Sequence, residues 1–287
     1  MNIDHATYWI TEREAIRKRR EQGQGPPWTS DPVLRNFRFC NVRREHDAVT
    51  RHIATTWREP NAGDPNLWFA MTLARFINLP ETLDELGYPV SWDRELFVSV
   101  LSSRMRRGDR VFGPAYVIPN GGSSKPKIDY LADNILNRLW RARDHMPPEQ
   151  GVTLAAYCAR LMHFDGIGSF MAAQVLADLK YVEPLRSAAD WTSFAISGPG
   201  SRRGLNRVMN RPPDAPWIEP AWRRAFGRFE EAIRPELQRI GLGDLHCQDL
   251  QNCLCEIDKY LRCALGQSAN SDRHSHYANY KRTSVLC

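Results

Sequence analysis

The stretch LMHFDGIGSFMAAQVLADLKY, residues 161–181, places Gly-Ile-Gly between two segments with helix-like apolar spacing. Glycine tolerates positive φ and close backbone approach, so the sequence predicts a tight turn here, with Ser169 as the N-cap of the second helix. Two interpretations stay open. The turn is a plain helix–helix corner, or it is a helix-hairpin-helix whose backbone N–H groups bind a DNA phosphate. In the second interpretation the binding residues are Gly166, Ile167, Gly168 and Ser169.

The charge of the chain favours a polyanionic partner. Its 287 residues, 42% of them hydrophobic, suffice for one large core or two coupled lobes. The formal net charge is +6 and the isoelectric point is near 9.0. Clustered basic residues are typical of nucleic-acid-binding proteins. The runs are RKRR at 17–20, RNFRFCNVRR at 35–44, RMRRGDR at 104–110 and RRGLNR at 202–207.

Neither a membrane segment nor a metal site is predicted. The mean hydropathy is −0.51, no apolar run approaches the ~20 residues of a membrane span, and the N-terminus lacks the apolar core of a secretory signal. Seven irregularly spaced cysteines indicate a reducing cytoplasm. Four of them lie near the C-terminus, in a spacing that matches no zinc or iron–sulfur pattern and so predicts buried thiols. They are Cys247, Cys253, Cys255 and Cys263.

The periodicity predicts a mainly α fold of two helical lobes around a central cleft. Residues 1–265 are expected to form one domain, with the hairpin and the site segment at about 150–210. A short hairpin or extended loop is expected at 111–122, and a polar tail that need not be ordered at 266–287. Helix-like periodicity covers 6–22, 31–58, 65–78, 93–106, 128–144, 152–163, 169–180, 219–239 and 247–265.

Asp190 follows the hairpin at an informative distance. It lies 22 residues beyond Gly168 and precedes the basic stretch SGPGSRRGLNR. Helix-hairpin-helix DNA glycosylases resemble this layout, with an essential aspartate about 20 residues after the turn that faces a flipped nucleotide. The alternative is that Asp190 caps a helix beginning at Trp191.

Three longer blocks carry a narrower resemblance: GPPWTSDPVLRNFRFCNVRREHDAVTRHI (25–53), DWTSFAISGPGSRRGLNRV (190–208) and DLQNCLCEIDKYLR (249–262). They resemble the α-glutamyl/putrescinyl thymine pyrophosphorylase family, the amino acid:DNA transferases of phage thymine hypermodification. Matching blocks run from about residue 8 to 265. The resemblance implies that a kinase first phosphorylates 5-hydroxymethyluracil in DNA. The transferase then replaces the phosphate-type leaving group with the nitrogen of an amino acid or polyamine, at the 5-methylene carbon of the base.

This chemistry needs a carboxylate to deprotonate the amine and cations to hold the departing phosphate. Asp190 is the candidate base. The loop after it is expected to form a backbone nest at Gly198 and Gly200, with arginine ligands beside it; the alternative is a solvated basic loop. The phosphate-binding candidates of this loop are Arg202, Arg203, Asn206 and Arg207.

The two outer blocks supply further substrate-binding candidates. Arg43, Asp47 and Arg51 are expected on one helical face, as a substrate surface or a salt-bridge ladder. In the last block one helical face is expected to orient the incoming amino acid, the alternative being polar groups that tie helices together. The remaining candidates are Arg38, Asn41 and Arg44 for phosphate or the uracil edge, then Asn252, Glu256 and Lys259 on one face, and Gln251 and Asp258 on another.

The predicted partners are double-stranded DNA carrying phosphorylated 5-hydroxymethyluracil and a free amino acid, in the cytoplasm of a bacterial host. The sequence identifies no cofactor with certainty, and it leaves open a monovalent cation at the hairpin or Mg²⁺ with the leaving phosphate. Nothing matches G-x-x-x-x-G-K-[ST], so ATP use is not expected. Phe170 stands where lyase-type glycosylases carry a nucleophilic lysine. Two alternative functions remain: a monofunctional DNA N-glycosylase and a non-catalytic protein that binds modified DNA.

Overall fold

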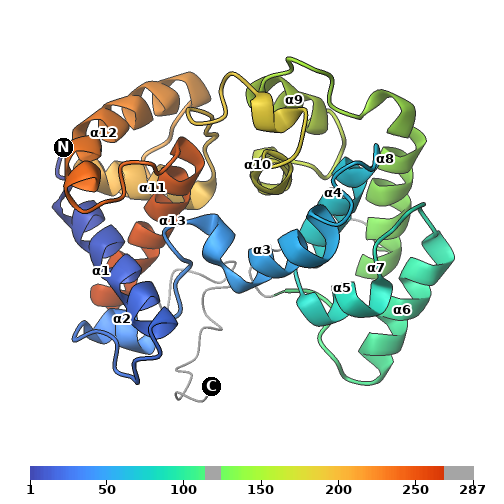
Figure 1. Cartoon of the computed structure of the whole chain (residues 1–287), viewed down its shortest axis with the longest axis horizontal. Helices are drawn as coiled ribbons and strands as arrows, with labels where there is room; N and C mark the ends of the chain where they lie inside the picture. The colour runs from blue at the N-terminus through green and yellow to red at the C-terminus, as the bar shows by residue number, and fades with distance from the viewer. Residues whose placement is uncertain (114–123, 268–287) are drawn as a thin grey trace. The chain divides into compact units, whose positions relative to one another are not determined.

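The computed structural model describes residues 1–113 and 124–267, which contain helices and connecting segments but no strand (Figure 1). The predicted mainly α class is therefore confirmed. Most of the segment 111–122 and nearly all of the tail 266–287 lie outside the described residues. The helix-hairpin-helix glycosylase-like arrangement, with its central cleft, stays a prediction.

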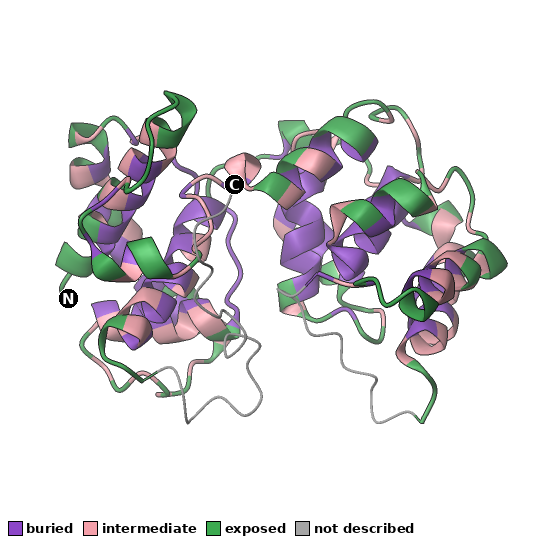
Figure 2. Ribbon diagram, turned by 90° about the horizontal axis from the view of Figure 1, so that it is seen from below, coloured by how far each residue is buried: buried purple, intermediate pink, exposed green. Residues whose placement is uncertain are grey.

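The chain divides into two compact units. Unit 1 comprises Met1–Asp47 and Thr192–Cys287, and unit 2 comprises Ala48–Trp191. In each unit the buried residues line the faces on which helices meet (Figure 2). This burial is the main source of stability, at roughly 25 cal/mol per Å² of apolar surface removed from water.

Unit 1 is organised around the closely packed pair α11 and α13. Gly204 faces this contact: a Cβ atom there would lie 2.0 Å from the carbonyl oxygen of Leu254. The core of the unit includes Trp9, Trp222 and Phe229, each with an exposed fraction of 0%. Its helices are α1 (Asp4–Glu21), α2 (Pro32–Asn36), the 3₁₀ helix η1 (Arg44–His46), α11 (Pro199–Val208), α12 (Glu219–Arg239) and α13 (Cys247–Ala264).

The predicted loop at 198–207 is wrong, because these residues form α11. Pro199 occupies the first turn, where proline is well tolerated, and Gly198 is the N-cap. The N–H of Gly198 donates to Ser201 Oγ (2.9 Å), so it is engaged within the helix start. A Cβ on Gly200 would lie 3.1 Å from Cys255 Sγ. The glycines that predicted a phosphate nest thus let α11 approach α13.

The helix-like periodicity of 31–58 corresponds to several short helical elements and not to one helix. Asp31 caps the short α2, accepting from Val33 N (2.7 Å) and Leu34 N (3.0 Å). It also accepts from the hydroxyls of Tyr8 (2.9 Å) and Tyr260 (2.7 Å). Burial and the hydrogen bond to Asp31 raise the pKa of Tyr8 to about 12. These bonds fix α2 against α1 and α13, and the chain then continues in extended form beyond Phe37.

Unit 2 is built on the buried pair α4 and α10. Every residue of α4 is buried, and α10 is buried from Met171 to Leu179. A helix that is apolar on all sides belongs in the centre of a core. The elements of the unit are α3 (Ala48–Ile53), the π-helical η2 (Ala54–Arg58), α4 (Leu67–Ile77), α5 (Pro80–Leu86), α6 (Arg94–Arg106), α7 (Lys127–Tyr130), the π-helical η3 (Leu131–Leu136), α8 (Asn137–Arg141), η4 (Arg143–His145), α9 (Leu154–Leu161), α10 (Ser169–Leu179) and η5 (Leu185–Ser187).

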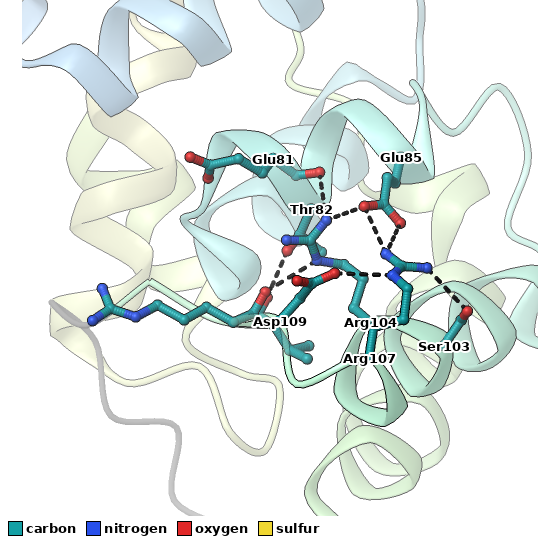
Figure 3. A network of polar contacts seen from close by, with 9 residues as sticks. Glu81, Thr82, Glu85, Ser103, Arg104, Arg107 and Asp109 are labelled. Carbon is teal, nitrogen blue, oxygen red and sulfur yellow. Dashed lines mark hydrogen bonds and ion pairs between the residues drawn. The ribbon is translucent and has the colours of Figure 1, made fainter.

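Part of the basic run 104–110 is used to join α5 to α6 (Figure 3). Arg104 and Arg107 both contact the carboxylate of Glu85, Arg107 at 2.8 Å, and Arg107 also reaches Asp109 at 2.9 Å. Hydrogen bonds and ion pairs with Arg107 and Arg104 lower the pKa of Glu85. Only Arg106 and Arg110 of this run are exposed without an acidic partner in the described residues.

Every helix in the described part of the chain is too short or too polar to span a membrane.

Of the four cysteines of α13 that were expected to be buried, Cys247 and Cys253 are buried, whereas Cys255 and Cys263 are partly exposed. Burial and the neighbouring Glu256 raise the pKa of Cys255 to about 12, and burial raises the pKa of Cys253 well above its usual value. Protonated thiols are poor metal ligands and poor nucleophiles. Across residues 1–113 and 124–267, no three His, Cys, Asp or Glu side chains are grouped as metal ligands.

Candidate functional site

The turn between α9 and α10 exposes both of its glycines and buries Ile167 between them. Gly166 has φ of +86°, and a Cβ there would lie 2.6 Å from the Ile135 side chain. Ile167 is 3% exposed. Gly168 is exposed with φ of −80°, and a Cβ there would meet no atom within 4 Å. A ligand can therefore approach the backbone at Gly168, whereas Gly166 shapes the turn.

The N-cap of α10 is Gly168, and not Ser169 as predicted. The carbonyl of Gly168 accepts from Ala172 N (3.0 Å), which makes Ser169 the first residue inside the helix. Among the described residues, no side chain forms a capping hydrogen bond at Gly168. A helix N-terminus of this kind attracts anions, because the peptide dipoles and the first N–H groups point outward.

Asp190 holds the start of α9. Its two carboxylate oxygens accept from Leu154 N (2.7 Å) and Ala155 N (2.9 Å). The helix expected to begin at Trp191 is absent, since Trp191 lies in a turn. Asp190 is thus a cap, but of a helix that begins 36 residues earlier in the chain. Its role as a general base stays a prediction.

Replacing Asp190 with alanine is expected to lower the free energy of unfolding by about 1–2 kcal/mol, because two N–H groups of α9 lose their acceptor. Denaturation in urea, followed by circular dichroism, measures this. Asp165→Ala is the matched control, since Asp165 forms only an exposed pair with Arg138 (2.8 Å) and should change stability by roughly 0–1 kcal/mol. Parental stability of Asp190→Ala would contradict the capping role.

Three arginines of unit 1 share one buried carboxylate. Asp258, whose side chain is 1% exposed, lies 3.2 Å from Arg203 Nε, 2.7 Å from Arg207 Nε and 3.1 Å from Arg262 Nε. We name these four residues the Asp258 cluster. Arg203 and Arg207 remain partly exposed, with 30% and 12% of their side chains accessible. Positive charge therefore exceeds the buried negative charge, and this surface favours an anion.

The other predicted arginine, Arg202, is not part of this cluster. Its Nε donates to Ser197 Oγ (2.7 Å), and its guanidinium lies 3.6 Å from Glu219. Asn206 is fully buried and donates to the carbonyls of Pro213 (2.9 Å) and Ala215 (2.8 Å), so it fixes the segment after α11.

Arg43, Asp47 and Arg51 do not share a helical face as predicted. Arg43 and Asp47 have extended backbone on either side of η1, and Arg51 belongs to unit 2. The side chain of Asp47 accepts from Asn41 N (2.7 Å) and so closes a loop that a helix would not allow. Burial raises the pKa of Asp47. The Arg43 side chain pairs instead with Asp244 (2.6 Å).

The polar face of α13 ties this helix to residues 38–40. Glu256 accepts from Cys40 N (3.0 Å), while Lys259 donates to the Arg38 carbonyl and lies 4.8 Å from the Phe39 ring centre. Both side chains are buried. This arrangement matches the alternative of polar groups joining elements.

Three further substrate-binding candidates come from the first and last sequence blocks: Arg44, Gln251 and Asn252. Arg44 N donates to Asp249 Oδ1 (3.1 Å), and Gln251 Nε2 lies 3.8 Å from Cys255 Sγ. The buried Nδ2 of Asn252 has no hydrogen-bond partner among the described residues. Substrate roles for these residues stay predictions.

Two buried arginines were not predicted from the sequence. Arg262 completes the Asp258 cluster, and its four-residue spacing from Asp258 was the available signal. Arg13 donates to the carbonyls of Cys40 (3.0 Å) and Phe39 (3.3 Å). Burial lowers its pKa. A charged residue on the buried face of α1 signals such a partner.

Comparison with known proteins shows sequence similarity to a phage DNA kinase. A family model described as "5-hmdU DNA kinase, helical domain" matches residues 2–270. A 5-hmdU DNA kinase of Bacillus phage SP10 is 26% identical over 281 residues, which cover 88% of this chain and 43% of the relative. The chain thus spans less than half the length of that curated relative. Comparison with solved structures gave no match.

Proposed function

The chain belongs to the family of 5-hmdU DNA kinase helical domains, and we propose that it binds duplex DNA and presents 5-hydroxymethyluracil for phosphorylation. The observation that carries this proposal is the family match over residues 2–270. The relative in phage SP10 supports a role in phage DNA modification, as the sequence resemblance implied. This relative supports phosphorylation of the modified base more directly than transfer of an amino acid to the base.

The geometry of each unit supports DNA binding. In unit 1 the Asp258 cluster holds three guanidinium groups around one buried carboxylate. In unit 2 the α9–α10 turn exposes Gly168 at a helix N-terminus without a side-chain cap. Both features favour phosphate, the group that contributes most to DNA affinity.

We propose that the site that binds the phosphate donor lies outside this chain. The sequence holds no G-x-x-x-x-G-K-[ST], the loop in which backbone N–H groups cradle nucleotide phosphates. More than half of the SP10 relative lies beyond the matched region. The contribution proposed for this chain is recognition of the DNA and of the modified base.

Amino acid transfer is the second candidate and needs a proton acceptor near the base. Asp190 was predicted for this role, but both of its oxygens are directed at the N–H groups of α9. A general base must lie within hydrogen-bond reach of the proton that it removes. Recognition for phosphorylation is therefore the better supported function.

Mass analysis of nucleosides distinguishes the candidates. The chain is incubated with 5-hydroxymethyluracil duplex or its phosphorylated form, with ATP and Mg²⁺ or with pooled amino acids. We expect both DNAs to be bound and their nucleosides to stay unchanged. A phosphate gained from ATP would place the chemistry within this chain. An amino acid gained on phosphorylated DNA would establish the transferase, and free base would establish a glycosylase.

A further inference from the structure

A cavity of about 650 Å³ lies within unit 2, between η2 and the segment that follows α10. Its volume falls in the range of small-molecule sites, roughly 300–1,000 Å³. No residue that lines it was among the sequence-based candidates. The lining residues used below are Arg58, Glu59, Tyr181, Arg186 and Trp191.

Two aromatic side chains form a fixed wall of this cavity. The rings of Tyr181 and Trp191 meet edge to face, with centroids 5.6 Å apart and an interplanar angle of 87°. Trp191 Nε1 donates to the carbonyl of Lys180 (2.6 Å), and Lys180 Nζ donates back to the carbonyl of Trp191 (2.8 Å). The Lys180 ammonium also lies 3.9 Å from the Trp191 ring centre. The tryptophan is therefore held in place before any ligand arrives.

The wall carries positive charge. The Arg58 guanidinium lies 4.8 Å from the ring centre of Tyr181, and its side chain is 4% exposed. Lys180 is fully buried beneath Trp191. Arg186 is exposed, and within the described part of the chain its side chain makes no hydrogen bond or ion pair. Glu59 is the acidic group of the lining; its side chain is 61% exposed and lies 3.3 Å from the Arg58 guanidinium.

The aromatic wall and the arginines together indicate which class of ligand the cavity can bind. The two arginines of the lining outnumber its one acidic residue, so the cavity favours an anionic group over a metal ion. A planar ring can stack on Tyr181 or Trp191, and an anionic group attached to that ring can contact Arg186 and Arg58. Nucleotides have both parts, and aromatic side chains with arginines are how proteins hold unstacked bases.

We propose that this cavity holds one unstacked nucleotide, with its base against Tyr181 and Trp191 and its phosphate against Arg58 and Arg186. This site rests on the proposed function in one respect: the nucleotide comes from the DNA that the chain binds. A free mononucleotide carries the same chemistry, and the ligands chosen below distinguish the two sources.

The first test compares variants that keep the fold. Arg186→Glu reverses the charge at the rim, and Tyr181→Leu removes one stacking face. Each should weaken binding of a fluorescein-labelled single-stranded oligothymidylate by about tenfold or more. Arg141→Glu is the matched control, because it makes the same charge change at an exposed residue of α8 that does not line the cavity. Thymidine 5′-monophosphate, titrated by calorimetry, shows whether a free nucleotide suffices.

Parental affinity of Arg186→Glu and Tyr181→Leu for the oligonucleotide would overturn the proposal. An equal loss in Arg141→Glu would also overturn it, since the loss would then come from the overall charge of the chain. If the parent does not prefer 5-hydroxymethyluracil duplex over thymine duplex, the proposed function fails instead. Binding of oligothymidylate at the cavity is measured independently of that preference.

Photocrosslinking tests the contact without relying on variant stability. 5-Iodouracil, placed at the modified position of the DNA, links to an aromatic side chain against which it stacks. We expect peptide mapping to find the crosslink at Tyr181 or Trp191. A crosslink confined to aromatic residues elsewhere in the chain would contradict the assignment of this cavity.

Discussion

Replacing Asp178 with asparagine is expected to lower the free energy of unfolding by about 3–5 kcal/mol, because it leaves the Arg75 charge buried without its partner. The pair joins α4 to α10 in the centre of unit 2, and the two side chains are 2% and 0% exposed. The contact is bidentate, with Arg75 Nε 2.6 Å from Oδ2 and Nη2 2.5 Å from Oδ1. Arg75 also donates to Thr50 Oγ (3.1 Å) and Asn78 Oδ1 (3.3 Å).

Urea denaturation followed by circular dichroism measures this loss. The double variant Arg75→Met with Asp178→Leu should be more stable than Asp178→Asn alone, because it removes both charges. Asp165→Asn serves as a control, since its pair with Arg138 is exposed on both sides. If Asp178→Asn unfolds at the parental urea concentration, Arg75 is not buried against Asp178.

Replacing Asp258 with asparagine is expected to lower the free energy of unfolding by about 3–4 kcal/mol. Three guanidinium groups lose the one buried carboxylate between them, and the side chain of Arg262 is only 7% exposed. The partial exposure of Arg203 and Arg207 keeps this loss below that of a fully buried pair. The magnitude therefore reports how far the cluster is shielded from water.

The change in stability on adding sulfate tests the Asp258 cluster more specifically. An added anion can replace the missing carboxylate between Arg203 and Arg207, so sulfate should stabilise Asp258→Asn more than the parent. Asp214→Asn is the matched control, because Asp214 contacts the same Arg203 (2.7 Å) but is 79% exposed. It should change stability by roughly 0–1 kcal/mol. Equal stabilisation of Asp258→Asn and the parent by sulfate would remove the Asp258 cluster as an anion site.

Six of the longer helices were predictable from the sequence. The ranges expected for α1, α4, α6, α10, α12 and α13 agree with the structure to within about two residues. Residues 199–208 were missed because two glycines and an N-terminal proline indicate a loop when read locally. Their helical state depends on packing against Leu254, which the local sequence does not reveal.

The candidate site was less predictable because its contacts join distant parts of the chain. Asp190 binds α9 across 36 residues, and Glu256 binds Cys40 across 216. Spacing identified these residues as polar and unusual but gave no information on their partners. The cavity of unit 2 could not be predicted for the same reason, because Arg58 lies far in sequence from Tyr181 and Trp191.

Competition binding measures directly whether this chain recognises 5-hydroxymethyluracil in duplex DNA. A labelled duplex with one 5-hydroxymethyluracil is displaced from the chain by unlabelled duplexes that carry 5-hydroxymethyluracil or thymine at that position. We expect the modified competitor to be the more effective, and the affinity for both duplexes to fall steeply with salt. Gly168→Leu should keep the fold, because a Cβ atom at this position meets no atom within 4 Å, and it should weaken binding of both duplexes alike. Equal displacement by the modified and thymine duplexes would contradict recognition of 5-hydroxymethyluracil by this chain.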